Sequence, residues 1–201
     1  DISKKDVATV TFDPQLTYNG KDQTQTMTVK VGGTTLALGT DYELNTTDGA
    51  ILTQKDAGSY TVIIKGMGNY TGTLLAAFTI APASLDNATI TLNSTANMVY
   101  DGTPKTTTIA VAFDDNDKMT PTEDVDYTVE FSDNINASEN AKVTITAKPN
   151  GNYTGTKTRT FTINKAKVTV DEIKAQDKTY DGNDTAKITG TLTGVVEKDR
   201  D

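Results

Sequence analysis

The pentapeptide GNYTG decides how this chain must be divided, because it occurs twice, at residues 68–72 and at residues 151–155. The two occurrences start 83 positions apart, and each leads into the same closing tripeptide Phe-Thr-Ile, at 78–80 and 161–163. Repetition with a period of many tens of residues is typical of tandem structural units. Turn residues recur between repeats more faithfully than ligand loops do. GNYTG is therefore interpreted first as one turn present in two copies of a unit.

Two further motifs keep this period, a Tyr-Asx-Gly triplet and an Asp-Tyr pair. Their first residues are Tyr18, Tyr100 and Tyr180 for the triplet, and Asp41 and Asp126 for the pair. The spacing drifts only where segments between apolar stretches differ in length, as surface loops do. The sequence therefore predicts one module at residues 1–83, a second at 84–166 and an incomplete third at 167–201. They are called copy one, copy two and copy three below.

Apolar and polar residues alternate in both of the longer copies. The aligned apolar positions are Met27, Val29 and Val31 with Ile109, Val111 and Phe113, and Tyr60, Val62 and Ile64 with Val143, Ile145 and Ala147. A period of two places one set of side chains on one face of a strand. One apolar face and one polar face are typical of antiparallel sheets that cover a core on one side.

Gly, Asn and Asp divide copy one into about seven short strands. These strands are expected near 7–12, 16–18, 25–31, 34–38, 41–45, 58–65 and 73–80. Short alternating strands at this density favour an all-β chain of tandem immunoglobulin-like β-sandwich modules. The alternative is a β-grasp-like module with one short helix, for which residues 53–57 are the best place.

The closing strand of copy two breaks the alternation. Lys157 and Arg159 share the parity of Phe161 and Ile163, so two cations fall on the apolar side of the strand. This pattern predicts either a β-bulge or a strand whose first half extends beyond the core.

Composition excludes several classes of function. The chain has 201 residues and a net charge of −8, which disfavours binding to nucleic acid and to anionic lipid. Cysteine and histidine are absent, so disulfides, thiolate metal sites and a histidine base are excluded. No apolar run is long enough to span a membrane, and the N-terminal residues lack the apolar segment of a signal peptide. We therefore expect a protein that is not an enzyme, binds no cofactor and inserts no part of this segment into a membrane.

Taken in order, the motifs resemble the MBG/YDG repeats of bacterial surface proteins. The resemblance rests on Tyr-Asx-Gly near the start of each copy, Asp-Tyr in the middle, and GNYTG before Phe-Thr-Ile. Copy three carries the YDG form at 178–182, followed by Gly-Thr-Leu-Thr-Gly at 190–194. The family implies tandem immunoglobulin-like modules in secreted or wall-attached proteins, used as an extracellular stalk or adhesin repeat. Its expected partners are neighbouring repeats of the same chain, and it supplies no catalytic residues.

The same tyrosines allow a binding function instead. Tyr70 and Tyr153, in the repeated loops, are the candidates for contact with an extracellular glycan or a host protein. The tyrosines of the Tyr-Asx-Gly triplets could stack on sugars in a similar way. As turn residues, all of these side chains would instead pack their rings and pair their hydroxyls with polar partners. A further alternative is an accessory domain of a polysaccharide-degrading enzyme.

An acidic loop in copy two is the candidate metal site. Asp114, Asp115 and Asp117 cluster there, and Ca²⁺ prefers oxygen ligands. The spacing matches no EF-hand, and the aligned loop of copy one, residues 32–35, is uncharged, so a solvated hairpin tip is the preferred interpretation. Isopeptide cross-links from Lys to Asn or Asp are not expected, because no acidic residue stands out on a core face.

Short links join the copies, at residues 81–83 and 164–166, and predict little freedom between successive modules. Copy three differs in detail, because Ile188 follows its tyrosine by eight residues where the other copies have an apolar residue at nine. Half a sandwich cannot bury a core alone. We expect copy three to be loosely ordered, or paired with copy two or with another chain.

Overall fold

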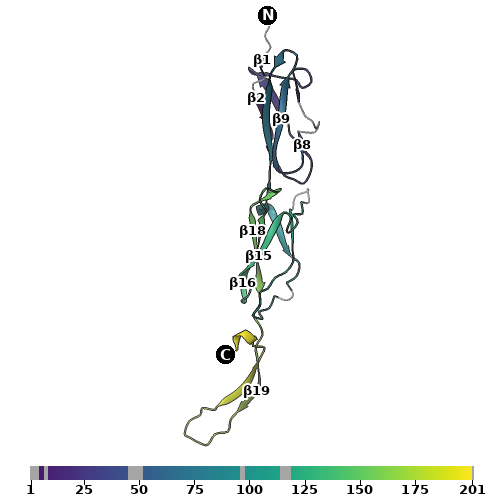
Figure 1. Cartoon of the computed structure of the whole chain (residues 1–201). Helices are drawn as coiled ribbons and strands as arrows, with labels where there is room; N and C mark the ends of the chain where they lie inside the picture. The colour runs from purple at the N-terminus through teal and green to yellow at the C-terminus, as the bar shows by residue number, and fades with distance from the viewer. Residues whose placement is uncertain (1–4, 7–8, 45–51, 96–97, 114–118, 201) are drawn as a thin grey trace. The chain divides into compact units, whose positions relative to one another are not determined.

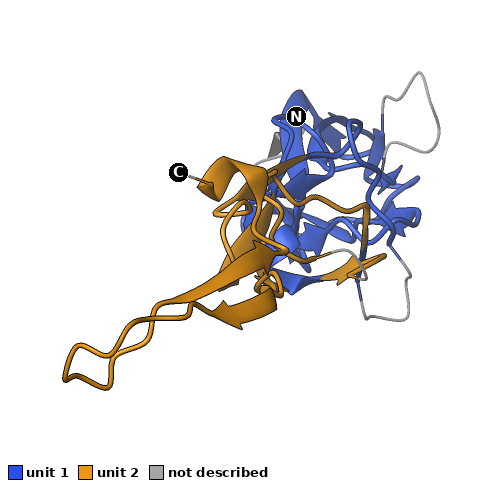
Figure 2. Cartoon of the chain, turned by 90° about the horizontal axis from the view of Figure 1, so that it is seen from below, with its two compact units in different colours: residues 1–89, 111–128, 145–157 blue, residues 90–110, 129–144, 158–201 orange. Residues whose placement is uncertain are grey.

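The chain is represented by a computed structural model that describes residues 5–6, 9–44, 52–95, 98–113 and 119–200. Within these residues the fold is all-β, with short 3-10 helices at η1 (Leu85–Asn87) and η2 (Glu197–Asp199) and no α-helix. The chain forms two compact units, coloured blue and orange in Figure 2. Unit 1 comprises residues 1–89, 111–128 and 145–157, and unit 2 comprises residues 90–110, 129–144 and 158–201.

The strands of copy one follow the predicted order. They are β1 (Lys5–Asp6), β2 (Thr9–Phe12), β3 (Leu16–Thr17), β4 (Gln23–Thr24), β5 (Met27–Val31), β6 (Thr34–Thr35), β7 (Tyr42–Leu44), β8 (Thr53–Gln54), β9 (Gly58–Gly66), β10 (Tyr70–Thr71) and β11 (Thr73–Ala81). Each of the seven predicted strands overlaps one of these. The short helix of the β-grasp alternative is wrong, because residues 53–54 form β8 and residues 55–57 are irregular.

Two sheets of unit 1, in the purple and blue part of Figure 1, contribute to one core. The first has the strand order β3-β11-β9-β7 and the second the order β2-β5-β6. β9 and β11 pair antiparallel along their length, whereas β3 pairs parallel with the end of β11. The buried core residues alternate along the strands, as predicted: Val29, Val31, Leu36, Tyr42, Val62, Ile64, Phe78 and Ile80. Burying each large apolar side chain stabilises the fold by about 1.5–3 kcal/mol.

The strands that follow belong wholly or partly to unit 2, except for β12 (Ala83–Ser84) and β17 (Tyr153–Thr154), which lie in unit 1. They are β13 (Ala88–Leu92), β14 (Ile109–Phe113), β15 (Tyr127–Ser132), β16 (Ser138–Ala147), β18 (Thr156–Ile163), β19 (Thr169–Ala175) and β20 (Ile188–Thr193). The core of unit 2 contains Met98, Ala141, Phe161 and Ile163.

The predicted alignment of the long strands needs a correction. Val62 and Ile64 of β9 are fully buried, and the same burial pattern in β16 belongs to Val143 and Ile145. The copies are therefore 81 residues apart at these strands, and Ala147 does not correspond to Ile64. A shift of two residues leaves the predicted inward and outward faces unchanged, because side chains alternate with a period of two.

The extra two residues of copy two lie in the loop that carries GNYTG. In copy one the backbone N–H of Gly66 donates to the carbonyl of Gly72, at 3.0 Å. In copy two the matching bond, also 3.0 Å, runs from the N–H of Ala147 to the carbonyl of Gly155. The same pentapeptide is thus carried by two loops of different length.

The cations of the closing strand lie beyond the buried part of β18. Phe161 and Ile163 are buried, whereas Lys157 is half-buried and Arg159 is exposed. The Lys157 ammonium donates to the carbonyl of Asp86, and the Arg159 guanidinium donates to a backbone carbonyl as well. The strand therefore overhangs its core at the start, the second of the two predicted explanations.

Candidate functional site

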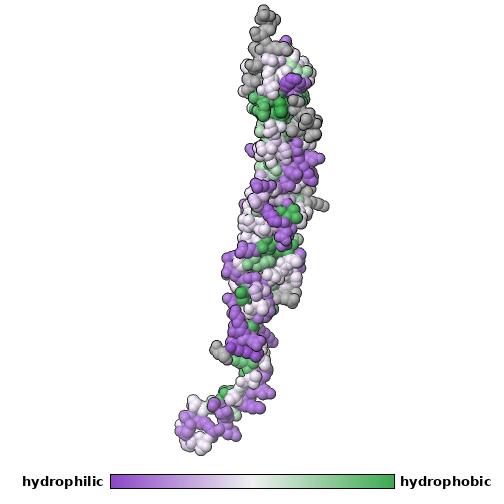
Figure 3. All heavy atoms as spheres, in the orientation of Figure 1, coloured by the Kyte–Doolittle hydropathy of each residue, from purple (hydrophilic) through white to green (hydrophobic). Residues whose placement is uncertain are grey.

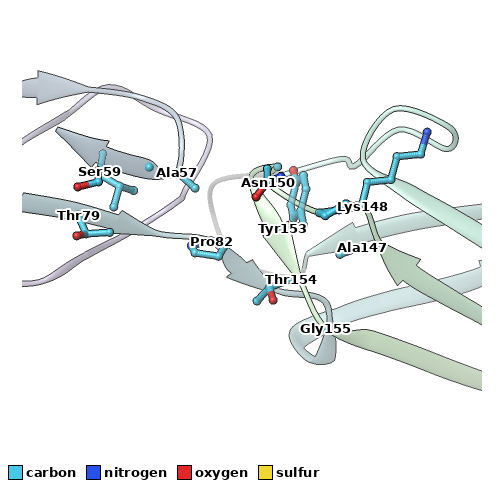
Figure 4. A pocket seen from close by; sticks show the side chains of 14 residues that line it. Ala57, Ser59, Thr79, Pro82, Ala147, Lys148, Asn150, Tyr153, Thr154 and Gly155 are labelled. Carbon is cyan, nitrogen blue, oxygen red and sulfur yellow. The ribbon is translucent and has the colours of Figure 1, made fainter.

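A hollow of about 520 Å³ lies within unit 1, where the ends of β9 and β11 meet the GNYTG loop of copy two. Figure 4 shows Ser59 and Thr79 on one side of it, Asn150 and Tyr153 on the other, and Pro82 of the link between them. The contacts around this hollow connect copy one to copy two. They are called the joint below.

Tyr153, one of the two predicted ligand residues, is only 6% exposed. Its ring stacks on Phe113 at a centroid distance of 5.8 Å and meets the edge of Tyr18 at 5.4 Å. Burial raises the pKa of the Tyr153 hydroxyl, and the neighbouring Tyr18 and Asp126 raise this pKa further. The hydroxyl therefore stays protonated at neutral pH. This tyrosine packs in the joint and offers little surface to a ligand.

Asn152 connects the same loop to copy one through its side chain. Its amide N–H donates to Asp56 Oδ1 at 3.0 Å, and its amide oxygen accepts the backbone N–H of Ala57 at 2.7 Å. Its backbone carbonyl accepts the N–H of Ala83 at 2.9 Å, next to the parallel pairing of β12 with β17. Both ends of the side-chain amide are thus used to hold the joint.

The first Tyr-Asx-Gly turn forms the other side of the joint. The backbone N–H of Tyr18 donates to the carbonyl of Ala81 at 2.8 Å, which places the turn beside the link. Gly20 adopts a left-handed backbone with φ of 76°, and a Cβ there would lie 3.4 Å from the side chain of Met119. Glycine suits this position because it accepts the positive φ without strain and lets Met119 approach.

All three Tyr-Asx-Gly turns have the same local geometry. In each, the Asx side chain accepts a backbone N–H two residues later, and the glycine has positive φ. The accepting side chains are Asn19, Asp101 and Asp181, at 3.0, 2.9 and 3.2 Å. The predicted tight turn is therefore confirmed in each copy.

The tyrosines of these turns have different surroundings. The Tyr18 ring packs on Tyr153. Within unit 2, the Tyr100 hydroxyl donates to both carboxylate oxygens of Asp199, at 3.0 and 2.8 Å, and this bond raises the pKa of Tyr100. Tyr180 is 92% exposed. Of the three, Tyr180 presents the most ring surface to a ligand.

Tyr70, the other predicted ligand residue, is half-buried and packs against the core of unit 1. Its strand β10 pairs parallel with β1, in the register Lys5↔Tyr70 and Asp6↔Thr71. This pairing corresponds to that of β17 with β12. The structure does not bring Tyr70 and Tyr153 together in one pocket, since Tyr70 is not among the residues that line the hollow.

The Asp-Tyr pairs are structural caps in both copies. Asp41 Oδ2 accepts the backbone N–H of Ala37 at 2.9 Å, and Asp126 Oδ2 accepts that of Thr122 at 2.8 Å. The adjacent tyrosines, Tyr42 and Tyr127, are buried, and burial raises the pKa of each hydroxyl. Each of these acids therefore positions a turn in its own copy.

The predicted calcium ligands Asp114, Asp115 and Asp117 lie outside the described residues. Among the residues that are described, no group of three or more acidic side chains could hold a metal ion. Gln25 is the one buried polar residue in this part of the chain, and its amide donates to the carbonyls of Pro14 and Thr26. No buried acid suited to isopeptide formation is therefore found there.

Sequence reasoning missed three residues of the joint, namely Asp56, Phe113 and Met119. Asp56 has no counterpart in copy two, where the residue 81 positions later is Ala137. Phe113 was expected only as a core residue. Met119 gave no signal, because it follows the acidic loop and belongs to no repeated motif.

On the face shown in Figure 3, hydrophobic residues lie in small groups between hydrophilic ones. No helix in the described part of the chain has the length and apolar character needed to cross a membrane. No protein-family model matches the chain, and no curated protein or solved structure is significantly similar to it.

Proposed function

We propose that this chain is a spacer, built from tandem immunoglobulin-like modules in the stalk or adhesin repeats of a bacterial cell-surface or secreted protein. One observation carries the proposal: in copies one and two, the residues of the repeated motifs form turns and packing contacts of the fold. GNYTG and Tyr-Asx-Gly meet through Tyr153 and Tyr18 in the joint, and Asp-Tyr caps a turn. Recurring residues that serve turns and packing are what a spacer requires, whereas a binding repeat would keep them accessible.

The strand pairing also suits a protein that carries tension. Within copy one, β1 pairs parallel with β10 and β3 pairs parallel with β11, the strand that leads into copy two. Tension applied along the chain would load several of these backbone hydrogen bonds at the same time, because the paired strands would have to slide past each other. The Asn152 amide adds two side-chain hydrogen bonds across the joint.

Single-molecule force spectroscopy on the full chain tests the spacer function. We expect discrete unfolding events, each releasing about 80 residues or roughly 250 Å of extension. The Asn152→Ala variant should show an event at lower force, and Asn69→Ala, at the matching position of copy one, should not. Smooth extension of the wild-type chain without discrete events would contradict the proposal.

A second candidate function is recognition of a glycan or a host protein by copy three. It is favoured by Tyr180, which is 92% exposed on a turn held by the Lys178 ammonium through Asp181, Asn183 and Thr185. An exposed tyrosine on a hydrogen-bonded turn is a suitable stacking surface for a sugar ring. A glycan array probed with the full chain and with Tyr180→Ala tests this function. Binding lost in the variant would support it, and an array without signal would favour the plain spacer.

A further inference from the structure

Copy three forms a two-stranded hairpin with one apolar face. β19 and β20 pair antiparallel, with Val170 opposite Leu192 and Ala175 opposite Ile188. A Cβ on Gly190 would meet the side chains of Val170 and Ile173, which places both on the same face as Ile188 and Leu192. Val170, Ile173, Ile188 and Leu192 are called the hairpin face below.

The hairpin face is open to solvent. Its four residues are 52%, 65%, 66% and 58% exposed in chain order. Every residue of both strands is exposed. An isolated hairpin of this kind is at best marginally stable in water, so an apolar face of four large residues calls for a cover.

Copy one shows what covers the same face in a longer repeat. Its strands β2 and β5 flank the first Tyr-Asx-Gly turn as β19 and β20 flank the third, and they also pair antiparallel. Their apolar face, which includes Val29 at 1% exposed, packs in one core with Val62, Ile64, Phe78 and Ile80 of the β9-β11 pair. The cover is therefore a second antiparallel pair with alternating Val, Ile and Phe side chains.

We infer that the hairpin face is a docking surface for the second half of a repeat of this same type. The occupant is a polypeptide with a long antiparallel strand pair, apolar on one face and ending in a Phe-Thr-Ile strand. Both antiparallel pairs carry large apolar side chains on one face, and of the two only the face of copy one is covered. This inference goes beyond the spacer function, since a spacer does not require an open sheet face.

A polypeptide spanning residues 119–163 of this sequence, added to the full chain, tests the inference. It carries β15, β16 and β18. We expect it to slow amide hydrogen exchange in residues 169–175 and 188–193 about a hundredfold, because those amides then open only with the complex. A Val170→Thr, Leu192→Thr double variant should lose this protection without a change in the melting temperature of the rest of the chain. Leu75→Thr, at an outward position of β11 that is 67% exposed, should keep it.

Three results would overturn the inference. The first is unchanged exchange at the solubility limit of the polypeptide. The second is protection confined to copy two, which would mean that the polypeptide takes the place of residues 119–163 of the chain itself. The third is protection of residues 188–193 in the chain alone, together with a dimer in sedimentation velocity, which would identify a second copy as the occupant. The spacer function is tested separately, because force spectroscopy is carried out on the chain without the polypeptide and its outcome does not depend on these results.

Discussion

The two GNYTG loops have identical sequences and different environments. In both, the Tyr-Thr dipeptide forms a short parallel-paired strand, with β1 as the partner in copy one and β12, at the boundary between the copies, as the partner in copy two. Tyr70 of the first loop is half-buried, whereas Tyr153 of the second is 6% exposed and contacts two aromatic rings. Two contacts of the second loop contribute to the difference: Tyr18 of copy one packs on Tyr153, and so does Phe113 of copy two, whose aligned residue in copy one is Val31. Burial of the motif thus depends on the neighbouring module as well as on its own copy.

The features that the loops share belong to the turn itself. Gly72 and Gly155 both adopt positive φ, at 89° and 84°, as the turn at the end of each pentapeptide requires. The features that differ belong to the joint, where Asn152 makes side-chain hydrogen bonds to residues 56 and 57. Substitutions at matched positions of the two loops therefore separate the energy of folding a module from the energy of joining two.

Truncation of the tyrosine should give the largest difference between the loops. Tyr153→Ala removes a nearly buried ring that packs on Phe113 and Tyr18, so we expect a loss of about 3–4 kcal/mol in the free energy of unfolding. Tyr70→Ala removes a half-buried ring and should cost about half as much. Urea denaturation of both variants provides the measurement. Equal losses would show that copy one contributes nothing to the packing of the second loop.

Truncation of the asparagine in each loop should give the next largest difference in the free energy of unfolding. In Asn152→Ala the backbone N–H of Ala57 and the carboxylate of Asp56 lose their partner, and we expect a cost of about 2 kcal/mol. Asn69 is exposed, so Asn69→Ala should change the free energy of unfolding by less than about 0.5 kcal/mol. Amide exchange at Ala57 gives a local check, since it should accelerate in the first variant only. A neutral Asn152→Ala would mean that water replaces the amide at no cost.

The fold could be predicted from the sequence to the extent that it depends on alternation. A period of two determines which side chains point inward, and this parity survives the two-residue error in aligning β9 with β16. The difference in loop length between the copies, in contrast, could not be seen in the sequence. Pro149 and Asn150 extend the turn of copy two without disturbing the spacing of the motifs on either side, because a shorter segment earlier in copy two compensates for them.

The joint could be predicted only in part. Its short link and its two turn motifs are visible in the sequence, since each repeats. Asp56 is not, because a contact between copies needs no counterpart inside either copy, and the aligned residue of copy two is Ala137. The Lys157 and Arg159 anomaly was informative because charged side chains on an apolar face require a specific geometric explanation.

Substitution of the first glycine of each pentapeptide should give a smaller difference in stability between the loops. This difference depends on loop length. Gly68 has a φ of 59°, and a Cβ there would lie 3.1 Å from the carbonyl oxygen of Thr40, so Gly68→Ala should cost about 1–1.5 kcal/mol. At Gly151 a Cβ would meet only the Lys148 carbonyl, at 3.6 Å, and the left-handed residue next to it is Asn150. Gly151→Ala should therefore lie within about 0.5 kcal/mol of wild type. Thermal unfolding of both variants measures the contrast, and a larger loss at Gly151 would show that the loops have the same turn after all.

Alkaline unfolding should give the smallest contrast, and it isolates the hydroxyl of Tyr153 from its ring. The folded pKa of this hydroxyl is raised by burial, whereas in the unfolded chain it titrates near the ordinary value of about 10. Below that pH the hydroxyl is neutral in both states, and above it the unfolded state loses the proton first, so stability falls as pH rises. The slope for one proton is at most about 1.4 kcal/mol per pH unit.

Tyr153→Phe removes that proton and keeps the ring. Between pH 10 and pH 11 the variant should lose about 1 kcal/mol less than the wild type in the free energy of unfolding. Tyr42 and Tyr127, whose pKa values are also raised by burial, contribute equally to both proteins and cancel in the difference. Urea denaturation at the two pH values provides the measurement. Parallel losses in both proteins would mean that the hydroxyl reaches water in the folded chain, and that copy one shields the second loop less completely than its contacts indicate.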